Sequence, residues 1–321
     1  MLSITKRIAA ALLCLWLLPL TAQAKELIPV GQVVGLELQS GRVTVEGFDS
    51  ELGTSAREAG LKEGDVLQKI NGKKVSCAED VRQALQRSTG TVTVVYSRDG
   101  KTKSCRVTPQ ITPQGPKLGV FLRQGITGIG TVTWYDPETG LFATLGHGVS
   151  GSNGILVDMT EGNTYEASVM QVKKGVSGKP GQLIGNIVGR QSIGQLTKNT
   201  DRGVFGKAET AWEKPAMEVG TASEIQTGKA TILSTVNGQE VREYSVEILK
   251  IYPKSKLNGR NLLIRVTDPA LLEATGGIVQ GMSGSPIIQD GKLIGAVTHV
   301  LVNDPTTGYG IFIENMLDAA G

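Results

Sequence analysis

The sequence predicts a mainly β protein of two domains, in which a small α+β module precedes a larger β sandwich or pair of β barrels. Glycine is abundant, with 42 of 321 residues, whereas aromatic residues make up only 4%. Short runs rich in Val, Ile and Thr alternate with glycine-containing turns along most of the chain, which is typical of strands joined by tight turns. A chain of this length is large enough for two hydrophobic cores.

The first 24 residues have the composition of a secretory signal peptide. Lys6 and Arg7 precede an apolar run over residues 8–20, and residues 22–24 (Ala-Gln-Ala) fit a cleavage site for export. The run is too short to cross a bilayer comfortably, although an uncleaved membrane anchor is the alternative. We therefore expect an exported protein from which residues 1–24 are removed.

Charge and cysteine content narrow the function classes. The formal net charge is +3, and removal of Lys6 and Arg7 with the signal peptide gives 3 − 2 = +1. A nearly neutral chain argues against nucleic acid as a partner. Two cysteines remain, Cys77 and Cys105, and they either pair in an oxidising compartment or stay as buried thiols. No spacing typical of zinc ligands occurs, so we expect neither a metal nor an organic cofactor.

The α+β module is expected over residues 25–108. Strand patterns at 32–38 and 42–48 are separated by a Ser40-Gly41 turn. A helix is predicted to begin at Ser76, with an acidic residue three positions later completing a capping box.

A linker and the larger domain follow. Residues 109–116 contain three prolines and predict an extended, semi-rigid linker. From residue 117 to 321 short strand patterns dominate, and only 269–274 and 313–320 have a helical pattern.

One segment of the module resembles PDZ domains. Residues 59–67 read Ala-Gly-Leu-Lys-Glu-Gly-Asp-Val-Leu and are followed by Ile-Asn-Gly at 70–72, which is similar to the PDZ signature. The resemblance implies that backbone N–H groups beside a glycine turn bind a chain-terminal carboxylate while an adjacent strand pairs with the peptide. The carboxylate-binding loop is expected at Gly35, Leu36, Glu37 and Leu38. The alternative is a module that only packs against the second domain.

The hexapeptide at 281–286, Gly-Met-Ser-Gly-Ser-Pro, has the pattern of a nucleophile turn. Ser283 lies between glycines that allow a tight turn, so its hydroxyl is exposed and nearby N–H groups can face a developing oxyanion. The hexapeptide resembles the nucleophile turn of chymotrypsin-like peptidases, which implies an oxyanion hole formed by the N–H groups of Gly281 and Ser283. Ser285 is a weaker candidate because Pro286 follows it.

A serine nucleophile needs a base, and the chain contains two histidines. His147 ends an apolar strand between Gly146 and Gly148, which leaves space for a substrate. His299 lies in a strand pattern sixteen residues after Ser283. It is an alternative base, but we expect it to line the pocket for the residue before the cut.

The carboxylate that orients the base is less clearly defined. Asp158, Asp201 and Asp268 lie between His147 and Ser283. The spacing favours Asp201, whereas a stiff local backbone before a proline favours Asp268.

Residues 117–321 resemble the stage IV sporulation protein B family of serine peptidases. The similarity lies in the segments around His147 and Asp268, in Thr275–Pro286, and in residues 293–300 and 303–310. The order of signal segment, PDZ domain and peptidase is also similar. The resemblance implies a chymotrypsin-like double β barrel with His147 as base, Asp268 as orienting carboxylate and Ser283 as nucleophile.

The resemblance further implies a regulatory endopeptidase of sporulation. Such an enzyme is exported into the space between the forespore and mother-cell membranes, cleaves itself, and cuts a membrane-anchored regulator of a membrane-embedded metalloprotease. Two alternatives are a general quality-control protease outside the cytoplasm and a non-catalytic PDZ scaffold.

Overall fold

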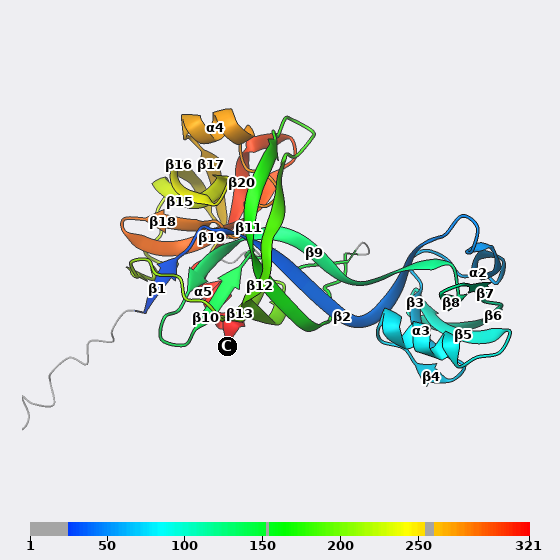
Figure 1. The fold of residues 1–321 in the computed structure, drawn as a ribbon. Coiled ribbons are helices and arrows are strands. Elements are labelled where there is room, and N and C mark those ends of the chain that lie inside the picture. Colours follow the sequence, from blue (N-terminus) through cyan, green and yellow to red (C-terminus); the bar gives the residue numbers. More distant parts are fainter. Residues whose placement is uncertain (1–24, 152–153, 254–259) are drawn as a thin grey trace, which may run out of the picture.

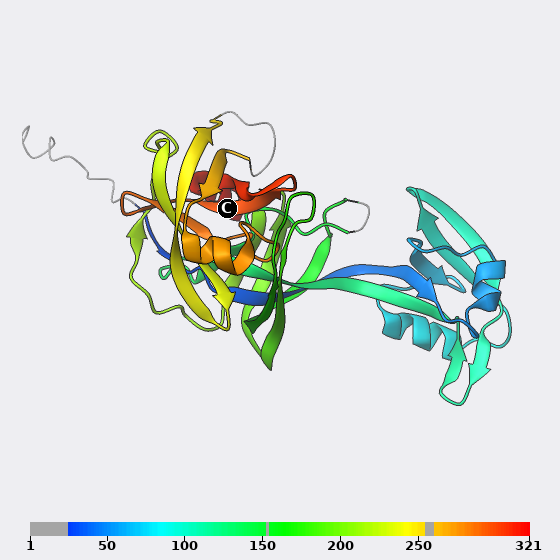
Figure 2. The same cartoon turned by 90° about the horizontal axis from the view of Figure 1, so that it is seen from above.

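The computed structural model describes residues 25–151, 154–253 and 260–321. The expected signal peptide lies outside the described residues. Two bodies are joined by a long ribbon of two antiparallel strands, β2 (Val33–Phe48) and β9 (Val120–Tyr135) (Figures 1 and 2). Among the described residues, no helix has the length and apolarity needed to span a membrane.

The larger body contains two β barrels. In the first, six strands pair antiparallel around a closed ring. Their spatial order is β2, β9, β10 (Leu141–Thr144), β13 (Gly203–Ala208), β12 (Gln182–Thr200) and β11 (Met159–Lys173), which returns to β2. The short strands β1 (Glu26–Pro29) and β14 (Met217–Glu218) extend its edge.

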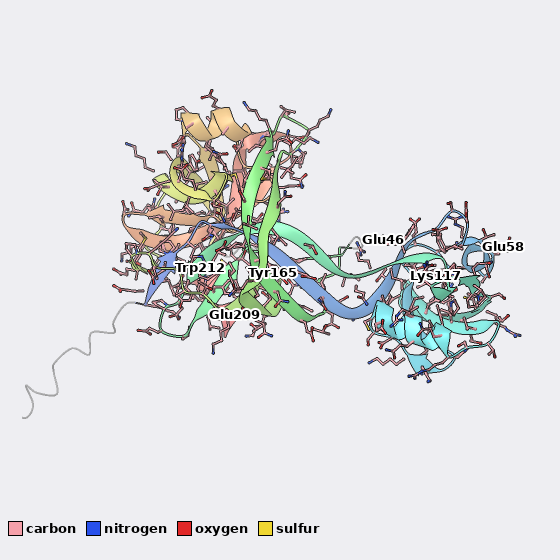
Figure 3. All side chains as sticks on the ribbon, in the orientation of Figure 1. Glu46, Glu58, Lys117, Tyr165, Glu209 and Trp212 are labelled. Atoms are coloured by element: carbon pink, nitrogen blue, oxygen red, sulfur yellow. The ribbon has the colours of Figure 1, made fainter. Side chains whose placement is uncertain are left out.

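Aromatic packing closes one part of the first barrel. The Trp212 ring lies with its centroid 5.5 Å from those of Tyr135 and Phe142, and its indole N–H donates to Gln32 Oε1 at 3.0 Å. Trp212, labelled in Figure 3, is 8% exposed. The buried indole therefore has both apolar partners and a satisfied donor.

The second barrel is also closed by six strands. Their order is β15 (Gly228–Asn237), β16 (Glu240–Ile251), β17 (Leu262–Val266), β20 (Asp304–Phe312), β19 (Lys292–Leu301) and β18 (Pro286–Gln289). The helices α4 (Pro269–Thr275) and α5 (Ile313–Ala320) lie where the sequence predicts them. The chain is mainly β and folds into a PDZ-type module and a double barrel. This architecture confirms the expected fold class.

The smaller body contains the predicted PDZ-like module. Its elements are α2 (Thr54–Glu58), β3 (Val66–Ile70), β4 (Lys73–Lys74), α3 (Ala78–Gln86), β5 (Val92–Arg98), β6 (Lys101–Val107), β7 (Gln110–Thr112) and β8 (Gly115–Lys117). The buried Asp65 carboxylate pairs with Arg98 at 2.6 Å and accepts the Lys62 N–H at 2.8 Å. The aspartate of the signature thereby fixes the turn in which it lies.

The structure corrects the predicted domain boundaries. Residues 33–39 of β2 pair with β9 and β11 inside the first barrel, and β1 also pairs with β9. The expected turn at Ser40-Gly41 is absent from the ribbon, because β2 continues to Phe48. The expected linker at 109–116 instead includes the β7–β8 hairpin. The smaller body is therefore an insertion between two strands of the first barrel.

Two local details also differ from the sequence analysis. Helix α3 is capped by Cys77, whose Sγ accepts the Asp80 N–H, while the Asp80 carboxylate accepts the Cys77 N–H. The capping box is thus one residue later than expected. Cys77 and Cys105 are both free thiols.

Candidate active site

The loop that carries Ser283 is bound to the opposite barrel. Thr131 of β9 donates its N–H to the Ser283 carbonyl at 3.0 Å and its hydroxyl to the Gly281 carbonyl at 2.9 Å. Gly281 and Gly284 have φ angles of +101° and +97°, which favour glycine. A Cβ at Gly284 would overlap the Thr131 carbonyl oxygen and lie 2.6 Å from the Leu145 nitrogen. The barrels therefore meet at a point where no side chain fits.

The N–H groups of this loop fall into two kinds. Those of Met282 and Gly284 donate to the carbonyls of Val279 at 3.1 Å and Val297 at 2.8 Å. Those of Gly281 and Ser283 have no acceptor within residues 25–151, 154–253 and 260–321. This leaves available the two donors that an oxyanion hole requires.

His147 follows β10 through two residues in the left-handed region. Leu145 has a φ of +71° and Gly146 one of +67°. A left-handed conformation costs a residue with a side chain about 1–2 kcal/mol, and such strain is common at functional sites. The turn is held by Thr131, whose carbonyl accepts the Leu145 N–H at 3.3 Å and the Thr144 hydroxyl at 2.7 Å. Thr131 thus contacts both the serine loop and the segment before His147.

The hydrogen bond of His147 defines its tautomer. Nδ1 lies 2.9 Å from the Gly148 carbonyl oxygen, which can only accept, so Nδ1 carries the proton and Nε2 has the free lone pair. Burial lowers the pKa of His147, while the bond to Gly148 opposes this effect. The imidazole is therefore neutral at pH 7, which is the form a general base needs.

Ser283 and His147 line one cleft of about 480 Å³. In this structure the Ser283 hydroxyl donates to the Thr298 carbonyl at 2.9 Å. Catalysis by this pair requires the hydroxyl proton to turn from Thr298 toward the imidazole. Apolar walls of the same cleft come from Ile129, Ile278 and other aliphatic side chains.

His299 of β19 lies beside His147 in this cleft. The ring centroids are 5.2 Å apart and the planes are tilted by 39°. Burial, then the neighbouring His147 and Arg260, lower the pKa of His299 to about 4. Its place in the cleft fits a pocket wall, but a role in selecting the residue before the cut stays a prediction.

The structure gives Asp268 different partners from those expected of an orienting carboxylate. Its oxygens accept the N–H groups of Ala270 at 2.9 Å, Leu271 at 3.1 Å and Ser245 at 3.3 Å. Asp268 is thus the N-cap of α4, which lies at one end of the second barrel (Figure 1). The acceptor at His147 Nδ1 is the Gly148 carbonyl. Of the other two candidates, Asp201 is exposed in the turn between β12 and β13, and the exposed Asp158 pairs with Arg42 at 3.1 Å.

Residues 35–38, the expected carboxylate-binding loop, lie inside the first barrel. Gly35 pairs with Ile129 of β9 and Tyr165 of β11, and residues 36–38 are likewise paired on both sides. A strand inside a barrel cannot offer its N–H groups to a peptide. The prediction for Gly35–Leu38 is therefore corrected by the strand pairing.

The smaller body contains a groove of its own. It has a volume of about 290 Å³ and lies between α3 and residues 116–122, which run from β8 into the start of β9. Val81 and Leu85 line its helical side, and Lys117 lies beside α3 (Figure 3). Gly119, with a φ of +68°, turns the chain before the strand. The glycine followed by Val-Phe-Leu is the sequence signal that could have identified it.

The fold and this cleft define a chymotrypsin-like serine peptidase with a PDZ domain. The family model for SpoIVB peptidase S55 matches residues 114–317, which is more than half of the chain, and a PDZ domain model matches residues 50–97. The chain therefore belongs to the SpoIVB peptidase S55 family.

Other similar proteins share shorter parts of the chain. The "Putative zinc metalloprotease mll0638" of Mesorhizobium japonicum is 32% identical over 92 residues, which cover 28% of this chain and 25% of that protein. The "Serine protease HTRA1" of Xenopus tropicalis is 40% identical over 57 residues, 18% of this chain and 12% of that protein. The chain thus spans a quarter or less of the length of these curated relatives.

Two solved structures overlap more of the chain at lower identity. The active form of the Rv3671c protease from M. tuberculosis has a TM-score of 0.34 and 17% identity, covering 61% of this chain and 73% of that one. The HtrA-type protease AlgW with a decapeptide has a TM-score of 0.36 and 14% identity, covering 72% and 61%.

Proposed function

We propose that this peptidase cleaves protein substrates through Ser283 as nucleophile and His147 as general base. The observation that carries the proposal is that both residues line one cleft, on segments that Thr131 joins. His147 Nε2 takes the Ser283 proton as Oγ attacks a peptide carbonyl, and the imidazolium then protonates the leaving amine. The N–H groups of Gly281 and Ser283 stabilise the oxyanion, a contribution of about 10²–10³ in rate for one donor.

The orienting acceptor in this proposal is the Gly148 carbonyl rather than a carboxylate. A carbonyl fixes the tautomer of His147 as an aspartate would, because it accepts the Nδ1 proton. It carries no full negative charge, so it stabilises the imidazolium less. Asp268 contributes instead to the stability of α4.

Substrate selection is assigned to two separate surfaces. The aliphatic walls of the catalytic cleft favour an apolar residue before the cut. The groove beside α3 would bind an extended peptide by strand addition to residues 118–122. Phe121 lines this groove and is 57% exposed, so Phe121→Ala should weaken peptide binding without unfolding the domain.

The biological setting proposed here follows from the family. The substrate is a membrane-anchored regulator of a membrane-embedded metalloprotease, and the enzyme is exported to the space between the forespore and mother-cell membranes, where it also cleaves itself. The apolar segment at 8–20, with its preceding positive charges, supports export. A general quality-control protease is the second candidate, and it would act on unfolded proteins without regard to one regulator.

The test combines a serine-reactive probe with identified products. Wild-type protein should be labelled by a fluorophosphonate, and Ser283→Ala should not. Mass spectrometry of the products from the ectodomain of a candidate regulator, mixed with wild-type and Ser283→Ala protein, should show discrete cuts only with the wild type. Equal labelling of both proteins would remove Ser283 from the mechanism. Cutting of denatured casein but not of the folded ectodomain would favour quality control.

A further inference from the structure

The only two histidines of the sequence lie side by side in the folded chain. His147 and His299 are separated by 152 positions, yet their ring centroids are 5.2 Å apart in the catalytic cleft. The mechanism proposed above uses one of these imidazoles. The other imidazole, that of His299, has a ring nitrogen without a hydrogen-bond partner in the described part of the chain, which the mechanism does not explain.

That nitrogen is Nδ1 of His299. It is buried and has no hydrogen-bond partner among the residues that the structure describes. A buried polar atom without a partner costs about 1–3 kcal/mol, so such an atom calls for an explanation. A metal ion that binds the lone pair of this nitrogen would explain why the nitrogen has no hydrogen-bond partner among those described residues.

His147 has the arrangement of a metal-binding histidine. Its Nδ1–H donates to the Gly148 carbonyl, which leaves the Nε2 lone pair available. Histidines that bind metals usually donate their other ring N–H to a carbonyl or carboxylate in this way. The same bond that prepares His147 as a base therefore prepares it as a ligand.

The separation of the two rings fits one bound ion. A Zn–N bond of about 2.0–2.1 Å plus about 1.2 Å from nitrogen to ring centroid gives an arm of about 3.2 Å. Two such arms at a tetrahedral angle of about 109° place the centroids about 5.2 Å apart. The observed distance is 5.2 Å.

The protonation state of the rings also suits a metal. Burial lowers the pKa of both histidines, so both are neutral at pH 7, as metal ligands must be. The Arg260 cation, which also lowers the pKa of His299, opposes a second cation. Two protein ligands and a nearby positive charge predict weaker binding than at zinc sites with three or four ligands.

We propose that His147 and His299 together bind Zn²⁺ or a similar divalent transition metal and that the bound ion inhibits the peptidase. Water completes the coordination from the cleft. The ion occupies the Nε2 lone pair that would take the proton of Ser283, so proton transfer stops. The site rests on ring geometry, whereas its effect on activity rests on the proposed function.

Binding is measured first, on protein without peptidase activity. Ser283→Ala protein is titrated with Co²⁺, followed by visible absorption, and with Zn²⁺, followed by calorimetry. We expect one tetrahedral Co²⁺ and one Zn²⁺ per chain, and loss of both in His147→Gln and in His299→Gln. Thermal unfolding establishes that each variant is folded. The Cys77→Ser/Cys105→Ser variant is the matched control, because it lacks the two free thiols that could compete for zinc, and it should bind normally.

Inhibition is measured second, as fluorophosphonate labelling of the wild type. When free Zn²⁺ is about ten times its dissociation constant, labelling should slow about tenfold by mass action. EDTA should restore it, and Mg²⁺ should have no effect. Absence of binding, or binding that persists in both folded histidine variants, overturns the proposed site. Binding without slower labelling overturns the inhibition and counts against His147 as base, while the metal site stands.

Discussion

The Asp268→Asn replacement separates a helix cap from an orienting carboxylate. The amide oxygen of the new side chain can still accept the N–H groups of Ala270 and Leu271, because Asn and Asp cap helices about equally well. The variant loses the acceptor for the Ser245 N–H, worth about 1 kcal/mol, and a negative charge at the N-terminus of α4, worth about 0.3–1 kcal/mol. The free energy of unfolding should therefore fall by about 1–2 kcal/mol.

Activity should respond differently from stability. As a cap, Asp268 does not touch the base, so the rate of fluorophosphonate labelling should stay within about threefold of the wild type well below the melting temperature. In a catalytic triad the same replacement lowers the rate about 10⁴-fold, because the histidine takes the wrong tautomer. Labelling measures the reactivity of Ser283 and needs no identified substrate.

Two matched variants complete this test. Asp268→Ala should lower the free energy of unfolding by about 2–3 kcal/mol, since it removes the cap as well. Asp201→Asn, in the exposed turn between β12 and β13, should leave labelling unchanged. A folded Asp268→Asn protein with labelling slowed by about a thousandfold or more would refute the reasoning and restore Asp268 as the orienting carboxylate.

Four other predictions concern the catalytic cleft and the segments that form it. Gly284→Ala protein should show little labelling even where it folds, because the added Cβ displaces the serine loop from Thr131. A shift of about 1 Å lowers the rate by about 10². Full activity of the folded variant would contradict the close contact between Gly284 and Thr131. Thr131→Val keeps the side-chain shape but leaves the Gly281 carbonyl unpaired, so chemical denaturation should show a loss of about 1–2 kcal/mol, whereas Thr131→Ser should retain the bond. The rate of labelling should be constant from pH 8 down to the ordinary histidine pKa of 6.5 and should fall only below it. The reason is that burial lowers the pKa of His147 and keeps the base neutral. A midpoint above pH 6.5 would contradict the lowered pKa of His147. The free energy of unfolding should also fall at low pH. The pKa of His299 is about 4 in the folded chain and 6.5 in the unfolded chain, so the unfolded chain binds the proton first. The stability present above pH 6.5 is therefore lost as the pH falls toward 4, and His299→Phe should reduce that loss.

The sequence alone determined the local features of this protein. Glycines at 281 and 284 around Ser283, and a histidine between glycines at 147, are short-range patterns that follow from what a tight turn demands. Asp65 of the PDZ signature forms its buried bond within its own turn and a neighbouring strand. Proline at 269 after Asp268 also predicts the start of α4, because it fits the first helical turn.

Only the tertiary structure decided which distant segments meet. The strand at 33–39 has the same pattern whether it pairs inside a PDZ module or inside a barrel, because alternation records burial and not the identity of the neighbour. The insertion of the PDZ domain between two strands of the barrel was therefore hidden from the sequence. The 5.2 Å separation of His147 and His299 and the contact of Thr131 with both catalytic segments depend on the pairing of strands far apart in the chain. A carboxylate before a helix looks the same in sequence whether it binds an imidazole or backbone N–H groups, and only the packed chain determines which donors it reaches.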